Sequence, residues 1–459
     1  MRQRTVNAVC VAALFAVLLY TYRYVVYPVY DYYGMGWKEE DATLAVVALL
    51  ANVSIAFLAP PAYRRPSQAF FAIQFLVVFL PASVVCLHTS LPEIPTFEAL
   101  SMLVAMYLGL LFQTLVHVHP TMRRRDLQRG FFERKSVLYA SAAFAVLVLA
   151  MSFASLRDIF SISALDSIYS QRDLFNDQSL WWGFVYGLSW LSVLVLPALF
   201  IASLALSDPY RAIGVGACVV GYVVLFGLMA TKTALFAPLI IYGFHALLKP
   251  RKLSYLAVLA IFIAVLLAVP LALAPFESLA DVNIVYTGIV NFRIFAVPHL
   301  LHAQYLDFFQ NHPLTYGSHI SVINRLIDYP YDAQVFILIG EEFYPGSNMT
   351  ANAGMWAQDG IASFGVLGIL LISALFTAAM AALDLASEGH DPRQVGAILS
   401  MMTLFVSNAS LFTTLLTGGL LLAIALLWST KRASTLRPRH GAHGSEFARA
   451  GRDMRHPQT

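Results

Sequence analysis

The chain has 459 residues, of which 59% are hydrophobic and 12% are charged, and its formal net charge is +3. Soluble globular proteins carry about 25% charged residues, so a soluble fold of this size would lack the polar side chains to cover its surface. We therefore predict an all-α polytopic membrane protein, and the composition excludes a disordered chain. The small net charge argues against a nucleic-acid partner.

Apolar runs long enough for membrane helices follow one another along the chain. The last run, 395–428, would be about 51 Å long as one helix against a bilayer core of ~30 Å, so the polar pair Ser407-Asn408 is predicted to divide it. This predicts about 12 transmembrane helices, nine within 1–273 and three within 361–428. The other ten runs are 6–24, 42–59, 69–87, 97–116, 137–154, 182–206, 212–230, 234–248, 254–273 and 361–383.

The first run follows two arginines and lacks a small-x-small cleavage site, which predicts an uncleaved anchor and a cytoplasmic N-terminus. With an even number of spans, about 22 of the 29 Lys and Arg residues fall in inner segments, as the positive-inside rule expects. The basic tail 429–459 is then cytoplasmic too. The inner segments are 1–4, 60–68, 117–136, 207–211, 249–252, 384–394 and 429–459.

Cys10, Cys86 and Cys218 each lie in an apolar run. Such positions are typical of small core residues, so we predict neither a disulfide framework nor a zinc site. The sequence contains no cofactor fingerprint, and no cofactor is predicted. His299 and His302 are three residues apart on a predicted helix. This spacing favours one polar face at an interface over a metal pair, because no third ligand is near.

One outer loop, 274–360, is much longer than the others and is rich in Tyr, Phe, His and Asn. Loops of this length are usually functional or disordered. Aromatic and aliphatic residues alternate with polar ones over 289–313, which favours amphipathic helices at the outer interface. The alternative is a structured lid without chemistry. A second outer loop, 155–181, contains Arg172 and ends in a tryptophan pair typical of the lipid headgroup level.

Lys232 lies in a predicted outer turn between two apolar runs, flanked by Thr231 and Thr233. The functional interpretation is an anion site, where the ammonium, the hydroxyls and the free N–H groups of the following helix meet a phosphate. The alternative is a lysine that snorkels to the headgroups. Arg293 and Arg325 are also isolated outer cations. Arginine suits bidentate phosphate contacts and lysine acts as a point charge, so the outer side is predicted to bind a diphosphate.

The segment 338–371 brings polar and aromatic residues to the start of a predicted span. Carboxylates and amides can hydrogen-bond the hydroxyls of a sugar, and an indole ring can pack against its C–H face. The alternative is a capped helix start, in which Gly354, Gly360, Gly365 and Gly368 allow close backbone approach. The residues in question are Glu341, Glu342, Asn348, Asn352, Trp356 and Asp359.

Three pieces of sequence resemble the O-antigen polymerase family, the bacterial oligosaccharide repeat-unit polymerases. They are "ATKTAL" (230–235), "FRIFAVPHLLHAQYLDFF" (292–309) and "NMTANAGMWAQDGIASFGVLGI" (348–369). The arrangement of spans, with a large outer loop before the last ones, is similar too. Ala230 departs from the family pattern, where Gly or Ser is more usual. The spacing of Arg172 and Gly183 also resembles that of periplasmic loops in the family.

The resemblance implies a GT-C-like, metal-independent glycosyltransferase in the bacterial inner membrane. Such an enzyme joins undecaprenyl-diphosphate-linked oligosaccharide units at the periplasmic face, and the product is O-antigen or exopolysaccharide. Membrane lipids surround it, and a chain-length regulator and a flippase are implied as partners.

On this interpretation the predicted site residues divide into two groups. Lys232, Arg293 and Arg172 stabilise the diphosphate, and Glu341, Glu342 or His312 takes the proton of the acceptor hydroxyl, with Asp307 as a further carboxylate. The second group binds the substrate, and it comprises Arg325, Tyr305, Tyr316, Asn348, Asn352, Trp356 and Asp359.

Two other functions fit the same outer side. An O-antigen ligase would transfer finished polysaccharide to lipid A-core with a similar large loop. A polysaccharide transporter or flippase would place polar residues at mid-membrane and use broken helices and internal repeats. The break at Ser407-Asn408 and His245 favour that class, whereas the position of the charges at the outer edge favours a polymerase.

Overall fold

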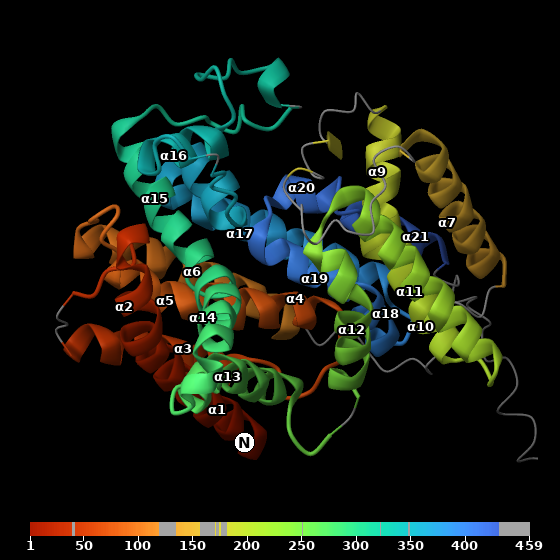
Figure 1. Cartoon of the computed structure of the whole chain (residues 1–459), viewed down its shortest axis with the longest axis horizontal. Coiled ribbons are helices and arrows are strands. Elements are labelled where there is room, and N and C mark those ends of the chain that lie inside the picture. The colour runs from red at the N-terminus through yellow and green to blue at the C-terminus, as the bar shows by residue number, and fades with distance from the viewer. Residues whose placement is uncertain are drawn as a thin grey trace, which may run out of the picture.

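The computed structural model shows an assembly of helices (Figure 1). It describes residues 1–38, 42–118, 135–156, 170, 174–175, 181–249, 251–321, 323–347 and 349–430. No strand occurs within these residues, so the predicted all-α class is confirmed for them. Arg172, Asn348 and nearly all of the basic tail 429–459 lie outside them.

The first half of the chain supplies ten labelled helices. Their bounds are α1 Arg2–Thr21, α2 Tyr27–Tyr30, α3 Ala42–Leu58, α4 Ser67–Ile73, α5 Leu80–His88, α6 Thr96–Val118, α7 Lys135–Leu156, α9 Trp182–Trp190, α10 Leu196–Leu204 and α11 Tyr210–Met229. Several of these join through π-helical turns into longer rods. The joining segments are η1 Tyr22–Val26, η3 Gln74–Phe79 and η6 Leu191–Val195.

The helices in the second half of the chain are interrupted more often than those in the first half. Its helices are α12 Lys232–Leu247, α13 Tyr255–Leu273, α14 Ala280–Thr287, α15 Val297–Asn311, α16 Val335–Phe343, α17 Ala362–Ala386, α18 Pro392–Ile398, α19 Ser400–Phe405, α20 Leu411–Leu415 and α21 Leu420–Thr430. Two π-helical segments precede long helices here, η8 Gly288–Ile294 before α15 and η10 Trp356–Ile361 before α17.

The described chain contains eight helices that are long and apolar enough to cross a membrane, or nine if the bent pair Glu277–Ile294 and Val297–Asn311 is one span. The chain is therefore a multi-pass membrane protein. We predicted about 12 spans; three of those runs contain shorter apolar helices, Thr43–Leu58, Leu138–Phe153 and Lys232–Leu247. Of the full helices, α3 and α12 are only about 25 Å long, which is shorter than a bilayer core.

The rod Ser67–His88 forms the centre of the assembly, because 89% of its most apolar stretch is buried inside the protein. α5 packs against α15, and α6 packs against α17. On one flank α1 contacts α3 and α13, and on the other α10, α11 and α12 contact one another. In Figure 1 the N-terminus lies near the lower edge, whereas α15 and α16 lie in the upper left part.

The apolar stretch 395–428 is divided where the sequence predicted. After α19 comes a short 3-10 turn, Val406–Asn408, and Ala409 is extended at φ −140° and ψ 156°. The side chain of Ser410 then accepts a hydrogen bond from the N–H of Thr413, which caps α20. The hydroxyl of Ser407 also donates to the carbonyl oxygen of Leu404, so Ser407 and Ser410 satisfy backbone groups on the two sides of this break.

The segment 289–313, predicted to lie along the outer interface, folds as η8 and α15. α15 follows η8 at a bend of 42° and begins with Pro298 in its first turn, where the missing proline N–H is not needed. Most residues of α15 are buried against neighbouring helices, so the helix is part of the packed core.

η10 and α17 form a tight hairpin instead of one straight helix. Phe364 and Gly365 leave helical geometry, and Gly365 has φ +61°. A Cβ on Gly368 would collide with the carbonyl oxygen of Gly360, although eight residues of straight helix span about 12 Å. The predicted close backbone approach is thus confirmed at Gly354, Gly360 and Gly368, whereas a Cβ on Gly365 would meet nothing within 4 Å.

Candidate functional site

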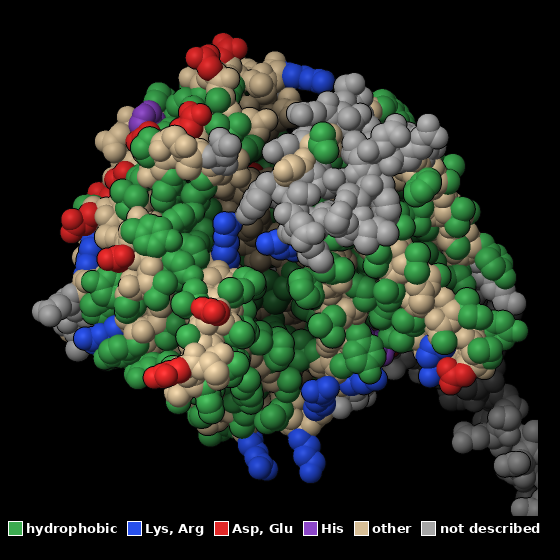
Figure 2. Space-filling view, in the orientation of Figure 1, with side chains coloured by type: hydrophobic (Ala, Val, Ile, Leu, Met, Phe, Trp, Pro, Cys, Tyr) green, Lys and Arg blue, Asp and Glu red, His purple; other side chains and the backbone are tan. Residues whose placement is uncertain are grey.

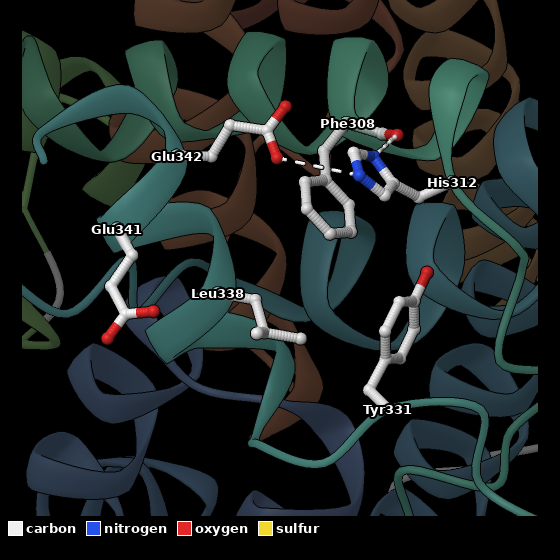
Figure 3. A pocket seen from close by; sticks show the side chains of 6 residues that line it. All are labelled: Phe308, His312, Tyr331, Leu338, Glu341 and Glu342. Atoms are coloured by element: carbon white, nitrogen blue, oxygen red, sulfur yellow. Dashed lines mark hydrogen bonds and ion pairs between the residues drawn. The ribbon is translucent and has the colours of Figure 1, made fainter.

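A pocket of about 330 Å³ opens between the end of α15 and α16 (Figure 3). α16 buries Val335, Ile339 and Gly340 and exposes its acidic end, which turns the two carboxylates of that helix outward. The loop before α16 adds a tyrosine. The lining residues are Phe308, His312, Tyr331, Leu338, Glu341 and Glu342.

The imidazole of His312 and the carboxylate of Glu342 face each other at the rim of this pocket. Nε2 of His312 lies 3.6 Å from Oε2 of Glu342, and both side chains are a little over one-third exposed. Nδ1 of His312 lies 3.0 Å from the carbonyl oxygen of Phe308, so this nitrogen carries a proton. The ring also stacks on Phe308 at 4.0 Å, whereas Glu341 points away from His312 in Figure 3.

Tyr331 closes one side of the pocket as a neutral phenol. Its O–H donates to the carbonyl oxygen of Pro313. Burial, with the nearby Tyr329 and Glu342, raises the pKa of Tyr331 to about 12. At neutral pH the side chain is therefore a hydrogen-bond donor with an apolar ring face, and the pocket combines aromatic faces with carboxylate acceptors.

Lys232 is the first residue of α12, directly after a left-handed Ala230 (φ 50°) and an extended Thr231. Its side chain and that of Thr233 are exposed. Thr231 makes no side-chain cap, and in the first turn of α12 the N–H of Ala234 donates to the carbonyl oxygen of Thr231. Lys232 thus lies exposed at the start of a helix, and the anion site stays a prediction.

Arg293 lies at the end of η8 with an exposed side chain. Figure 2 shows a hollow in the middle of this face, with Lys or Arg side chains beside it over the α14–α15 junction and over the start of α12. The cations on these two elements are Arg293 and Lys232. Within the described chain, neither has an ion-pair or hydrogen-bond partner.

The structure separates Arg293 from the acidic pocket. Arg293 precedes α15 and His312 follows it, and this helix of 15 residues is about 22 Å long. Glu341, Glu342 and His312 therefore do not share a reacting atom with Arg293. The predicted single site is resolved into two regions, one cationic and one acidic and aromatic.

Three predicted substrate contacts are interior residues in this structure. Tyr305 and Asp359 are completely buried and Trp356 is 1% exposed. The O–H of Tyr305 donates to the carbonyl oxygen of Ala351 at 3.0 Å, and Nε1 of Trp356 donates to Oγ of Ser373 at 2.9 Å. None of the three is open to a sugar here, and each supports the fold beneath the outer surface.

Tyr316, Asn352 and Arg325 are exposed, and Asp307 is half-buried. Tyr316 has a left-handed backbone (φ 51°) and packs edge-on against Phe364. Asn352 donates to Thr350, and Arg325 stands on a short outer turn. Asp307, on α15, lies close enough to Glu98 for the two charges to interact.

His299 and His302 both lie inside the protein on α15, with stacked rings 5.8 Å apart. The predicted interfacial face is thus a buried pair. Among the described residues, no group of three or more His, Cys, Asp or Glu side chains could hold a metal ion. Cys86 and Cys218 are buried core residues, as predicted.

His319 is not among the residues predicted from the sequence. This residue lies between Thr315 and Asp359, 16% exposed, in the segment after α15. This histidine belongs to no sequence motif, and only its contacts with Thr315 and Asp359 in the folded protein identify it.

No family model, no curated protein and no solved structure matches this chain. The established description is therefore an all-helical, multi-pass membrane protein.

Proposed function

We propose that the chain is a glycosyltransferase of the bacterial inner membrane, which polymerises undecaprenyl-diphosphate-linked oligosaccharide units at the periplasmic face. The observation that carries the proposal is a pair of cations, Lys232 and Arg293, which have no ion-pair or hydrogen-bond partner among the described residues and lie on elements that flank one hollow. Uncompensated cations among membrane helices are functional by default, because isolated charge is unfavourable there. A lipid diphosphate supplies the missing negative charge from the bilayer itself.

The reaction needs charge stabilisation at the diphosphate. The bond between the sugar C1 and the diphosphate oxygen breaks, and the electron pair leaves with the diphosphate. A hydroxyl oxygen of the incoming unit forms the new bond to C1, and its proton passes to a base. Lys232 with the N-terminus of α12, and Arg293 as a bidentate partner, stabilise the developing charge.

The acidic pocket takes a different part in this proposal. Its distance from Arg293 suits sugars further along the oligosaccharide, because Phe308 and Tyr331 offer ring faces and Glu341 and Glu342 offer acceptors for hydroxyls. Glu342, Glu341 and His312 then orient the sugar chain. The base at C1 is left to a group nearer the hollow or to water.

The test is Lys232→Ala in living cells and in purified protein. We expect lipid-linked single units to accumulate and long-chain polysaccharide to disappear, while the protein inserts in the membrane at normal abundance. Lys249→Ala, at the other end of α12, is the matched control, and it should leave the chain lengths unchanged. Normal long chains in Lys232→Ala would overturn the proposal.

An O-antigen ligase remains the nearest alternative. It shares the lipid-diphosphate donor, so the same cations would serve it. The lipid-linked intermediates separate the two functions. A polymerase defect accumulates single units, whereas a ligase defect accumulates lipid-linked polymer.

A transporter or flippase is favoured by one structural observation, the concentration of breaks in the second half. α17 kinks at Phe364–Gly365, the chain breaks again after Phe405, and the buried Asp359 lies beside both. Purified protein in vesicles decides between the two classes. Movement of a lipid-linked oligosaccharide between leaflets without elongation would support transport, and elongation would support the polymerase.

A further inference from the structure

The side chains that line the pocket between α15 and α16 offer hydrogen-bond acceptors and no free donor. The O–H of Tyr331 is engaged with the carbonyl oxygen of Pro313. The carboxylates of Glu341 and Glu342 only accept when they are ionised, and two further lining residues are apolar. The pocket is therefore suited to a ligand that donates hydrogen bonds.

His312 adds a further acceptor when its imidazole is neutral. A carbonyl oxygen can only accept, so Nδ1 of His312 is the donor to the carbonyl oxygen of Phe308, 3.0 Å away. A neutral imidazole has one N–H, and Nε2 then carries a lone pair. This lone pair faces Oε2 of Glu342 at 3.6 Å. Two acceptors thus face each other at the rim, where a donor from a ligand can bridge them.

The gap between these two acceptors fits a primary ammonium group. One nitrogen can lie about 2.9 Å from both atoms when they are 3.6 Å apart. An ammonium has three N–H donors and serves both acceptors, whereas a hydroxyl has one hydrogen and serves only one. The rings of Phe308 and Tyr331, which also line the pocket, attract a cation through their faces.

The charge around the pocket favours the same ligand. Neither Glu341 nor Glu342 pairs with a Lys or Arg among the described residues, and Asp307 lies close enough to His312 for their charges to interact. Figure 2 shows Asp and Glu side chains over the upper left of this face, where Figure 1 places α15 and α16. A cationic sugar is attracted here and a sugar that carries a carboxylate is repelled.

We propose that this pocket binds an amino sugar, whose ammonium group lies between His312 and Glu342. The inference rests on the proposed function, because it assigns the pocket one unit of the oligosaccharide. Ethanolamine headgroups of lipids carry the same ammonium group. The sugar is favoured because the pocket and Arg293 lie at opposite ends of α15, about 22 Å apart along the helix, so the pocket meets a unit further along a chain that begins at the diphosphate.

The test compares three sugars that differ only at C6. Methyl glucoside carries a hydroxyl there, its 6-amino-6-deoxy derivative an ammonium, and methyl glucuronoside a carboxylate. Each is titrated against the full chain in phosphatidylcholine nanodiscs by saturation-transfer NMR at about pH 8, where an ordinary imidazole is neutral and an alkyl ammonium is charged. We expect the ammonium sugar to bind about tenfold more tightly than the hydroxyl sugar, and the carboxylate sugar to bind least. Equal binding of all three, or binding of none, would overturn the proposal.

Two variants make the assignment specific. Glu342→Gln keeps the size of the side chain and removes its charge, so the preference for the ammonium sugar should disappear. Glu277→Gln, on the exposed turn before α14, is the matched control and should keep the preference. A preference that survives in Glu342→Gln, or that is lost in Glu277→Gln, would contradict the proposal.

A further comparison separates the two sources of the ammonium group. Phosphatidylethanolamine replaces part of the phosphatidylcholine in the nanodiscs. An unchanged affinity for the ammonium sugar supports the sugar as the ligand, whereas competition by the lipid would assign the pocket to a headgroup and overturn the proposal. None of these measurements involves polymerisation. Failure of the amino-sugar assignment is therefore distinguishable from failure of the proposed function, which is read from chain lengths in Lys232→Ala.

Discussion

The rings of Tyr30 and Phe292 lie stacked with centroids 3.9 Å apart and planes within 8°. This contact joins the end of the first membrane rod to η8, more than 260 residues later. Tyr33 adds an edge-on contact to the same Phe292 ring at 5.0 Å and stacks on Tyr344, which follows α16. The aromatic cluster therefore fixes the backbone immediately before Arg293 and connects both proposed substrate regions.

The first prediction concerns this stack. Tyr30→Ala removes the ring that supports Phe292, and aromatic pairs contribute about 0.5–1.5 kcal/mol beyond their buried area. We expect a small drop in thermal stability and a several-fold loss of polymer, because Arg293 is less well held. Tyr30→Phe keeps the ring and should restore both. Polymer yield is read on gels and protein abundance by immunoblot; a defect in Tyr30→Phe equal to that in Tyr30→Ala would assign the effect to the hydroxyl.

The second prediction separates shape from charge at Arg293. Arg293→Lys keeps a positive charge but loses the planar fork that binds two phosphate oxygens at once. We expect chain extension to fall at least tenfold, which corresponds to about 1.4 kcal/mol of transition-state stabilisation. Extension rates with purified lipid-linked units measure it. Full activity would show that Arg293 acts as a simple point charge or supports the fold.

The third prediction tests the hairpin between η10 and α17. Gly368→Ala places a methyl group on the carbonyl oxygen of Gly360, so the two arms must move apart. Forcing extra volume into packed structure costs about 1–3 kcal/mol. We expect a lower midpoint of thermal unfolding in detergent. Gly243→Ala, on α12 with nothing within 4 Å of the new methyl group, is the control and should unfold as the native chain does.

The fourth prediction follows from the raised pKa of Tyr331. With a pKa of about 12, this phenol stays protonated in the folded protein where an ordinary tyrosine, near 10, ionises. Its contribution to stability is therefore complete below about pH 10 and is lost as pH rises toward 12. The difference in phenolate absorbance between the native chain and Tyr331→Phe should be flat up to about pH 11. A step centred near pH 10 would show an ordinary, solvated tyrosine.

Several features of the fold could be predicted from the sequence because they depend on local chemistry. A 59% hydrophobic chain with few charges requires lipid as part of its solvent. The break at Ser407-Asn408 follows from helix length against bilayer thickness. The close approach at Gly360 and Gly368 follows from residues without a side chain.

The arrangement of the candidate site could not be predicted in the same way. In a membrane, an apolar helix face packs equally well against lipid or against protein, so hydropathy does not reveal which of the two covers it. The sequence of α15 therefore predicted an interfacial helix, although the helix is enclosed by protein. Trp356 was likewise predicted to contact a sugar, although its Nε1 donates to Ser373 inside the hairpin.

What the sequence determined by itself is the class: helices in a bilayer, their breaks, and a few cations isolated between apolar runs. Only the tertiary structure decided that α15 holds Arg293 and Glu342 in separate regions and that His319 meets Asp359. These relationships join residues 40 or more positions apart, and they arise from how the helices pack, which no local pattern along the chain encodes.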